Sequence, residues 1–244
     1  MAKNLHSAKL EQERNVFLAE LAASLPVLTS LNGGGSDSRR ARILHSTFLP
    51  IYILKRHKPV DLKTKYAEIL FTYAIEAECL LILGFKNAAR TMLRGWLEAA
   101  IKFVYYEYHP IENIAHHDGE QARIHGIEYR EFIYMFPGLK DISFFARDTF
   151  ERLWADLCKS VHVNLRCVEK LSIVADLESA LNLPEPDFQM LLNLLKTLQK
   201  VIIALLFSVR NDWASQMEKA LFETLFAEFT PEERNQTHTL LRIE

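Results

Sequence analysis

Residues 62–108 limit the possible folds of this chain more than any other segment. They hold two long apolar stretches that contain no proline and that meet at Leu83-Gly84-Phe85. Both stretches have helical periodicity, and the glycine between them is a turn signal. The segment therefore predicts a long helical hairpin. Because no convincing alternating strand occurs elsewhere, the predicted fold is an all-α multi-helix bundle.

Apolar periodicity and helix breakers predict the remaining elements. Before the hairpin we expect a helical pattern over 5–25 and a short helix over 42–55 that Pro50 interrupts. The further predicted helices span 61–83, 86–108, 111–135, 141–161, 163–181, 186–211 and 213–228, with a last one after Thr230-Pro231-Glu232-Glu233. That last start has proline at the first helical position and acids in the first turn. The expected start near 141–143 has Asp141 and Ser143 as candidate caps.

One run of glycine and serine divides the chain into two parts. The run Gly33-Gly34-Gly35-Ser36 has the composition of a flexible linker. The predicted organisation is therefore an N-terminal helical arm over 1–30, a linker over 31–40 and a single helical-bundle domain over 41–244.

The helix at 186–211 is the predicted centre of the bundle. Its first half has one polar side, formed by Asn193, Lys196, Thr197 and Lys200, whereas 201–209 is apolar on every face except at Ser208. A helix that is apolar all round is surrounded by other helices. The apolar run is too short to span a bilayer, so no membrane contact is predicted.

Several features of the composition favour a cytoplasmic protein without a bound cofactor. The first fifteen residues lack the apolar core of a signal peptide. Cys79, Cys158 and Cys167 are odd in number and form no metal or redox motif, as expected of reduced thiols. The histidine cluster formed by His109, His116, His117 and His125 with Asp118 lacks a metal-binding signature, so a solvated helix face is the preferred interpretation and no metal site is predicted.

Basic residues are concentrated near the linker, although the whole chain has a net charge of −2. Residues 39–65 contain eight lysines and arginines against one acid, Asp61. This segment can be a solvated basic face, a contact for nucleic-acid phosphates or a surface for a protein partner. The nucleic-acid-binding candidates are Arg39, Arg40, Arg42, Lys55, Arg56 and Lys58.

Charged residues also mark both helices of the predicted hairpin. Arg90, Arg94, Glu98 and Lys102 follow one another at four-residue spacing, as in a ladder of surface ion pairs. Glu78 instead lies among apolar residues on the first helix. If the hairpin folds back at Gly84, Glu78 comes level with residues 90–94, so we predict a buried pair of Glu78 with Arg90 or Arg94.

The second helix and a later element resemble a known group. Leu83-Gly84, Ala88, Leu93-Arg94 and Leu97-Glu98, followed by Leu157-Cys158-Lys159-Ser160-Val161-His162, are similar to bacterial helical proteins related to the HEPN superfamily and to abortive-infection proteins. The resemblance covers about residues 80–165. It implies a HEPN-like bundle in a bacterial defence or toxin-like system, and it makes Arg94, Glu98 and His162 candidate catalytic residues.

Ribonucleases of the HEPN superfamily carry an arginine and then, after four to six residues, a histidine that can act as acid or base. Arg210-Asn211-Asp212 stands at the late position where such a motif begins in these ribonucleases, but no histidine follows it at that spacing. The spacing occurs only for Arg39 or Arg40 with His45, so Arg40 and His45 are weaker candidates.

The leading hypothesis is a non-catalytic binding or regulatory protein. It has two alternatives, a metal-independent ribonuclease and a nucleic-acid-binding module that uses 39–65. A homodimer or another protein partner is also expected. Either core packing or a dimer interface explains an aromatic-rich set of residues, which are Tyr105, Tyr106, Tyr108, Phe132, Tyr134, Phe136 and Trp154.

Overall fold

The computed structural model describes residues 16, 36–59, 61–62, 64–83, 85–112, 126–136, 139–158, 185–210, 212–215 and 217–241. Within these ranges every regular element is helical, so the predicted all-α bundle is confirmed. The α-helices are α2 (Ser36–Arg56), α3 (Tyr66–Ile82), α4 (Lys86–Tyr108), α6 (Gly126–Met135), α7 (Arg147–Cys158), α9 (Glu185–Val209), α10 (Asp212–Ser215), α11 (Lys219–Leu225) and α12 (Pro231–Leu241). Two short 3-10 turns, η2 (Leu139–Asp141) and η3 (Ser143–Phe145), precede α7.

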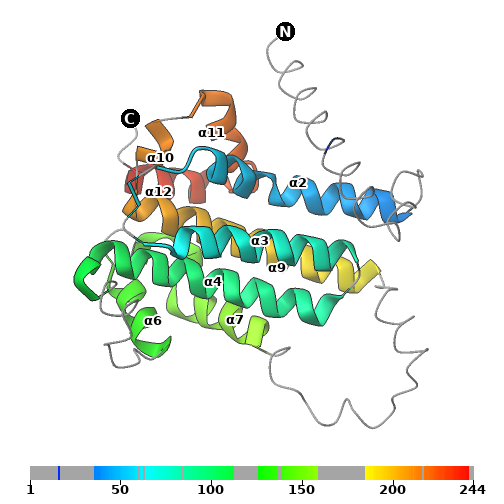
Figure 1. Ribbon diagram of the computed structural model, residues 1–244, viewed down its shortest axis with the longest axis horizontal. Helices are drawn as coiled ribbons and strands as arrows, with labels where there is room; N and C mark the ends of the chain where they lie inside the picture. Colours follow the sequence, from blue (N-terminus) through cyan, green and yellow to red (C-terminus); the bar gives the residue numbers. More distant parts are fainter. Residues whose placement is uncertain are drawn as a thin grey trace.

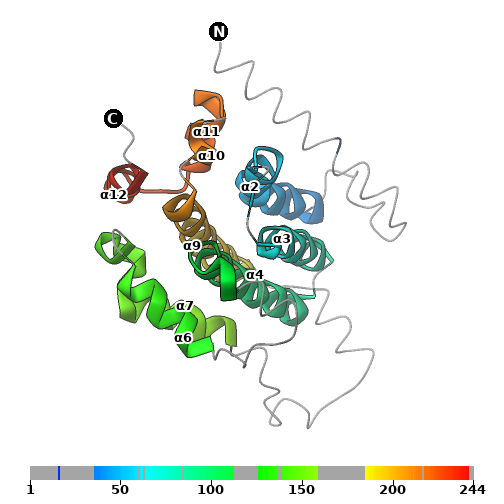
Figure 2. The ribbon, with the colours of Figure 1, turned by 60° about the vertical axis from the view of Figure 1, so that its left-hand side comes forward.

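The α3–α4 hairpin and α9 form the middle of the bundle (Figure 1). In Figure 2, α2 lies beside α3 on one side of α4 and α9, whereas α6 and α7 lie on the other. Helices α4 and α9 run in the same direction. An ion pair of 3.7 Å between Lys86 and Asp187 joins their first turns, and Phe103 contacts Trp213, which follows the end of α9.

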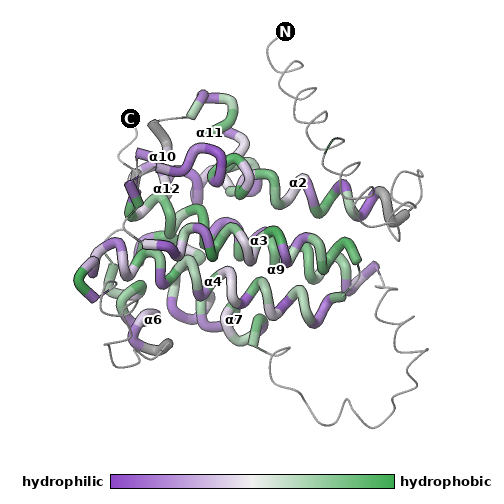
Figure 3. Tube along the Cα trace, viewed as in Figure 1, coloured by the Kyte–Doolittle hydropathy of each residue, from purple (hydrophilic) through white to green (hydrophobic). Residues whose placement is uncertain are grey.

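Helix α9 is the core helix that its sequence predicts. All residues from 201 to 207 are buried. The helix is long and apolar enough to cross a membrane, with a mean hydropathy of 1.7 over its best window, but 67% of that window is buried inside the bundle. A helix that is apolar on most sides and covered by other helices is a core helix of the bundle. In Figure 3, polar residues interrupt the apolar ones along α3 and α4, which are helices with one exposed side.

Helix α2 differs from its prediction in two ways. It begins at Ser36, so residues 36–40 belong to the helix and not to a linker, and it continues through Pro50 without a break. Proline removes one backbone hydrogen bond. The helix persists because its apolar side, including Phe48 and Leu54, is buried in the core. Near the end of the helix, Trp213 Nε1 donates to the Leu54 carbonyl over 3.0 Å.

Other boundaries also differ from those predicted. Helix α3 begins at Tyr66 rather than 61, and α7 begins at Arg147 rather than 141 because η2 and η3 occupy 139–145. The helix expected over 213–228 is divided into α10 and α11, since Glu218 has extended backbone angles. Most of 5–25 and all of 163–181 lie outside the described residues, as does the first part of 111–135 that follows residue 112.

Candidate functional site

A groove of about 420 Å³ opens between α4, α7 and α9. One arginine of α4 contributes to it, and α7 and α9 form its two long walls. The lining residues are Arg90, Thr149, Arg152, Leu153, Asp156, Met190, Asn193, Leu194 and Thr197. A groove of this volume falls within the size range of small-molecule sites in proteins, about 300–1,000 Å³.

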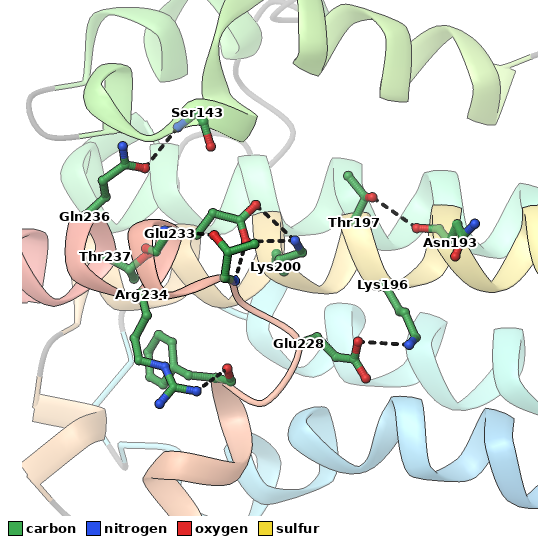
Figure 4. A network of polar contacts seen from close by, with 12 residues as sticks. Ser143, Asn193, Lys196, Thr197, Lys200, Glu228, Glu233, Arg234, Gln236 and Thr237 are labelled. Atoms are coloured by element: carbon green, nitrogen blue, oxygen red, sulfur yellow. Dashed lines mark hydrogen bonds and ion pairs between the residues drawn. The ribbon is translucent and has the colours of Figure 1, made fainter.

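The two walls are regular because each uses one stripe of a helix. The α7 residues are 149, 152, 153 and 156, and the α9 residues are 190, 193, 194 and 197, both at the spacing that places side chains on a single helix face. The helices run in opposite directions. Ser143, just before α7, donates its N–H to Gln236 of α12, and α12 is in turn tied to the second half of α9 by Lys200 and Glu233 (Figure 4). The start of α7 thus lies toward the second half of α9, and the end of α7 toward the start of α9.

Arg90 and Arg152 give the groove its positive charge. Within the described part of the chain, no carboxylate lies at ion-pair distance from either guanidinium. The Nε atom of Arg90 is buried and has no hydrogen-bond acceptor among these residues. A buried guanidinium N–H without an acceptor has lost its water without compensation. Arg90 therefore has one buried N–H without an acceptor, and no carboxylate of the described residues pairs with its guanidinium.

An aromatic and cationic cluster lies beside this groove. The guanidinium of Arg94, one turn after Arg90, lies 5.6 Å from the ring centre of Trp154, and that of Arg130 lies 4.6 Å from it. Arg130 also pairs with Glu151 over 3.3 Å. Trp154 thus packs between two arginines. These contacts join α4, α6 and α7. Arg94 packs on the Trp154 ring and has no ion pair in the described structure.

The buried pair predicted for Glu78 has a different partner. Glu78 is fully buried, but its Oε1 lies 2.8 Å from Nδ1 of His45 and its Oε2 accepts a hydrogen bond from Tyr52. Both partners come from α2, and Arg90 and Arg94 do not contact Glu78. The prediction was wrong because the Glu78 side of α3 faces α2 and not α4. Burial, followed by the nearby Glu78 carboxylate, raises the pKa of Tyr52.

The catalytic candidates are not brought together. His45 is only 4% exposed, and its Nδ1 is held by Glu78. Arg40 instead pairs with Glu185 over 2.8 Å and lies over the Phe188 ring. Glu98 pairs with Lys102 over 2.8 Å, which is the one rung of the predicted ladder found in the described chain. His162 lies outside the described residues, so its position relative to Arg94 and Glu98 stays a prediction.

The basic segment is partly neutralised. Arg40 pairs with Glu185, and Lys58 pairs with Glu68. The exposed side chains of Arg39, Arg42 and Lys55 have no ion pair within the described ranges. They lie on α2, away from the groove. Nucleic-acid binding by this segment stays a prediction.

No group of three or more His, Cys, Asp or Glu side chains in the described residues could hold a metal ion. Of the predicted histidine cluster, only His109 is described, and its Nδ1 lies 2.8 Å from the Tyr105 carbonyl oxygen. Cys79 and Cys158 are free thiols, and Cys167 lies outside the described ranges.

The sequence alone predicts some of the residues that line the groove. Asn193 and Thr197 belong to the polar side predicted for the first half of α9, and Arg90 was singled out on α4. Thr149, Arg152 and Asp156 were missed. Their spacing on α7 was a usable signal, because it is the same as that of the polar side of α9.

Comparisons with protein-family models, with curated proteins and with solved structures found no match to this chain.

Proposed function

We propose that this protein is a helical-bundle binding protein that captures a small molecule by its anionic group in the α4–α7–α9 groove. The observation that carries the proposal is that Arg90 and Arg152 line the same groove without a carboxylate partner in the described chain, and that Arg90 Nε is buried without an acceptor.

The chemistry of arginine supports an anion as the missing partner. Guanidinium groups bind carboxylates and phosphates through pairs of charge-assisted hydrogen bonds. An anion bound to the Arg90 guanidinium would offset the cost of desolvating that side chain. The groove has one acid, Asp156, among its nine lining residues, so its side chains sum to a positive charge.

The lining residues favour binding over acid–base catalysis. Arginine, threonine, asparagine, leucine and methionine side chains do not change protonation state near neutral pH, and Asp156 is the only other titratable group among the nine. General acid–base catalysis requires a group that titrates near the working pH. Asp156 is thus the one lining side chain that can accept a proton, and the other eight offer charge, hydrogen bonds and apolar contact.

An NMR titration tests the proposal with inorganic phosphate and butyrate as probes. We expect shifts of the side-chain Nε–Hε signals of Arg90 and Arg152, and affinities about 10-fold weaker or more in Arg90→Gln and Arg152→Gln, since hydrogen bonds to charged groups contribute about 1.5–3 kcal/mol. Arg42→Gln is the matched control, because Arg42 is exposed and lies on α2. Equal binding by the wild type and Arg90→Gln/Arg152→Gln would refute the proposal, as would equal loss in the control.

A further inference from the structure

The walls of the groove also carry apolar side chains, and these lie next to the two arginines. Leu153 of α7 and Leu194 of α9 line the groove from its two opposite walls. Met190 lies one turn earlier on α9 and is 54% exposed. The flexible methionine side chain can adapt to an apolar ligand, and covering its exposed surface favours binding.

The position of Arg90 relative to Met190 follows from the parallel course of α4 and α9. Lys86 pairs with Asp187 over 3.7 Å. Arg90 is one turn after Lys86, and Met190 is one turn after Asp187, so the two side chains are at the same level of the groove. Arg152 is next to Leu153 in sequence on the opposite wall. The cationic groups and the apolar surface are thus adjacent.

We infer that the ligand is an alkyl anion, in which a carboxylate or phosphate is joined directly to an aliphatic chain. This inference rests on the proposed anion-binding function and adds the chemistry of the rest of the ligand. Arg90 and Arg152 bind the head group. Leu153, Leu194 and Met190 cover the chain, while Thr149 and Thr197 close the far end of the groove with hydroxyl groups.

The groove also limits the length of the chain. Each wall spans seven residue steps, about 10 Å at the 1.5 Å rise of a helix, which accommodates about eight carbons. Burial of each methylene increases affinity by up to about fourfold. Affinity should therefore rise from butyrate to octanoate by at least about 10-fold, and should gain little from octanoate to dodecanoate.

A titration series tests this inference on the full-length protein. The probes are acetate, butyrate, hexanoate, octanoate, dodecanoate and octyl phosphate, with octylamine as the charge control. We expect the rise with chain length to be largely lost in Met190→Gln and Leu194→Asn, with acetate affinity unchanged. Met135→Gln is the matched control, since Met135 is 74% exposed and lies on α6. Comparison of octanoate with octyl phosphate identifies the preferred head group.

The outcomes separate the two proposals. If small anions bind and chain length has no effect, or if Met135→Gln flattens the series as much as Met190→Gln, the alkyl-chain inference is overturned and anion binding stands. If neither acetate, phosphate nor the longer anions bind, both proposals are overturned. Binding of octylamine as tight as that of octanoate would overturn the role of the arginines. Because Met190 is exposed, its variant keeps the test valid if Leu194→Asn does not fold.

Discussion

The Nδ1 atom of His45 in α2 lies 2.8 Å from Oε1 of Glu78 in α3, and both side chains are buried. Tyr52, two turns after His45, donates its hydroxyl to the other carboxylate oxygen. Each oxygen of a fully buried carboxylate is therefore hydrogen-bonded by α2. A buried carboxylate is stable only with such partners, so these contacts specify how α2 packs on α3.

Removing the carboxylate alone should destabilise the protein. Glu78→Leu removes the carboxylate that the buried His45 and the partly buried Tyr52 contact, and we expect a loss of about 3 kcal/mol in the free energy of unfolding. The triple variant His45→Leu/Tyr52→Phe/Glu78→Leu should recover most of that loss, because apolar groups replace all three of these side chains together. Urea unfolding measures both.

Glu76→Leu is the control for this experiment, because Glu76 is exposed on the same helix. Its stability should stay within about 0.5 kcal/mol of the wild type. A Glu78→Leu variant as stable as this control would contradict the assignment, and so would a triple variant no more stable than the single one.

The sequence showed that Glu78 lies on an apolar helix face, and hence that it needs a buried partner. Its partner could not be deduced, because which helix covers that face is decided by contacts between distant segments. The hairpin suggested α4. The true neighbour, α2, was expected to be a short helix interrupted at Pro50, and a helix broken there would place His45 and Tyr52 on separate pieces.

The groove is likewise predictable from the sequence only in part. Helical periodicity was sufficient to place Asn193 and Thr197 on one side of α9 and to mark Arg90 on α4. It could not show that α7 packs antiparallel to α9, since that depends on contacts such as Ser143 with Gln236, ninety-three residues apart in sequence. From the sequence alone, Arg152 is therefore one charged residue among many, whereas in the fold it lines the same groove as Asn193.

Gly95 leaves room for the Tyr73 ring, so we expect a glycine to be needed at this position only while Tyr73 is present. A Cβ atom at Gly95 of α4 would lie 2.9 Å from Cε1 of the Tyr73 ring in α3. Gly95→Ala should therefore gain little in the wild type, because the contact offsets the helix propensity of alanine. In the Tyr73→Ala background the same change should stabilise the protein by about 1 kcal/mol.

A double-mutant cycle measured by urea unfolding checks this coupling. Ala88→Gly is the control at an exposed position of the same helix, and it should cost about 1 kcal/mol in both backgrounds. If Gly95→Ala changes stability equally with and without Tyr73, the two residues are not coupled and the explanation is wrong.

His238 should make the protein less stable in mild acid. Its imidazole packs on Phe222 and Phe226, and its Nε2 is buried without a partner in the described structure. Burial, followed by the charge of Arg234, lowers the pKa of His238. The unfolded chain binds a proton there below about pH 6.5, whereas the folded state resists it. This group therefore stabilises the fold above that pH and loses its contribution as pH falls.

His238→Phe keeps the aromatic contacts and cannot be protonated. The variant should lose less stability than the wild type between pH 7.5 and pH 5, as measured by the urea midpoint at each pH. His57→Gln is the control, since His57 directly follows α2 and makes no ring contact with Phe222 or Phe226 among the described residues. An equal acid-induced loss in the wild type and His238→Phe would rule out His238 as its source.

The start of α12 couples a helix cap to the core helix. Thr230 Oγ1 accepts the N–H of Glu233 over 3.2 Å, and the Thr230 N–H donates to Glu233 Oε2 over 2.8 Å, a reciprocal capping box. The same carboxylate binds Lys200 of α9 at 2.9 and 3.0 Å (Figure 4). This confirms the helix start predicted at Thr230-Pro231, and it gives Glu233 two separable roles.

Three variants separate these roles by urea unfolding. Thr230→Ala should cost about 1 kcal/mol through the lost cap. Glu233→Gln retains an acceptor for the Thr230 N–H but loses the charge that faces Lys200, and should cost about 1–2 kcal/mol because the pair is mostly shielded from water. Glu233→Ala loses both contacts and should cost more than Glu233→Gln. Thr239→Ala, exposed on the same helix, is the control. If Glu233→Gln and Glu233→Ala destabilise equally, the reciprocal hydrogen bond from Thr230 contributes nothing, and the ion pair with Lys200 alone holds this end of α12 on α9.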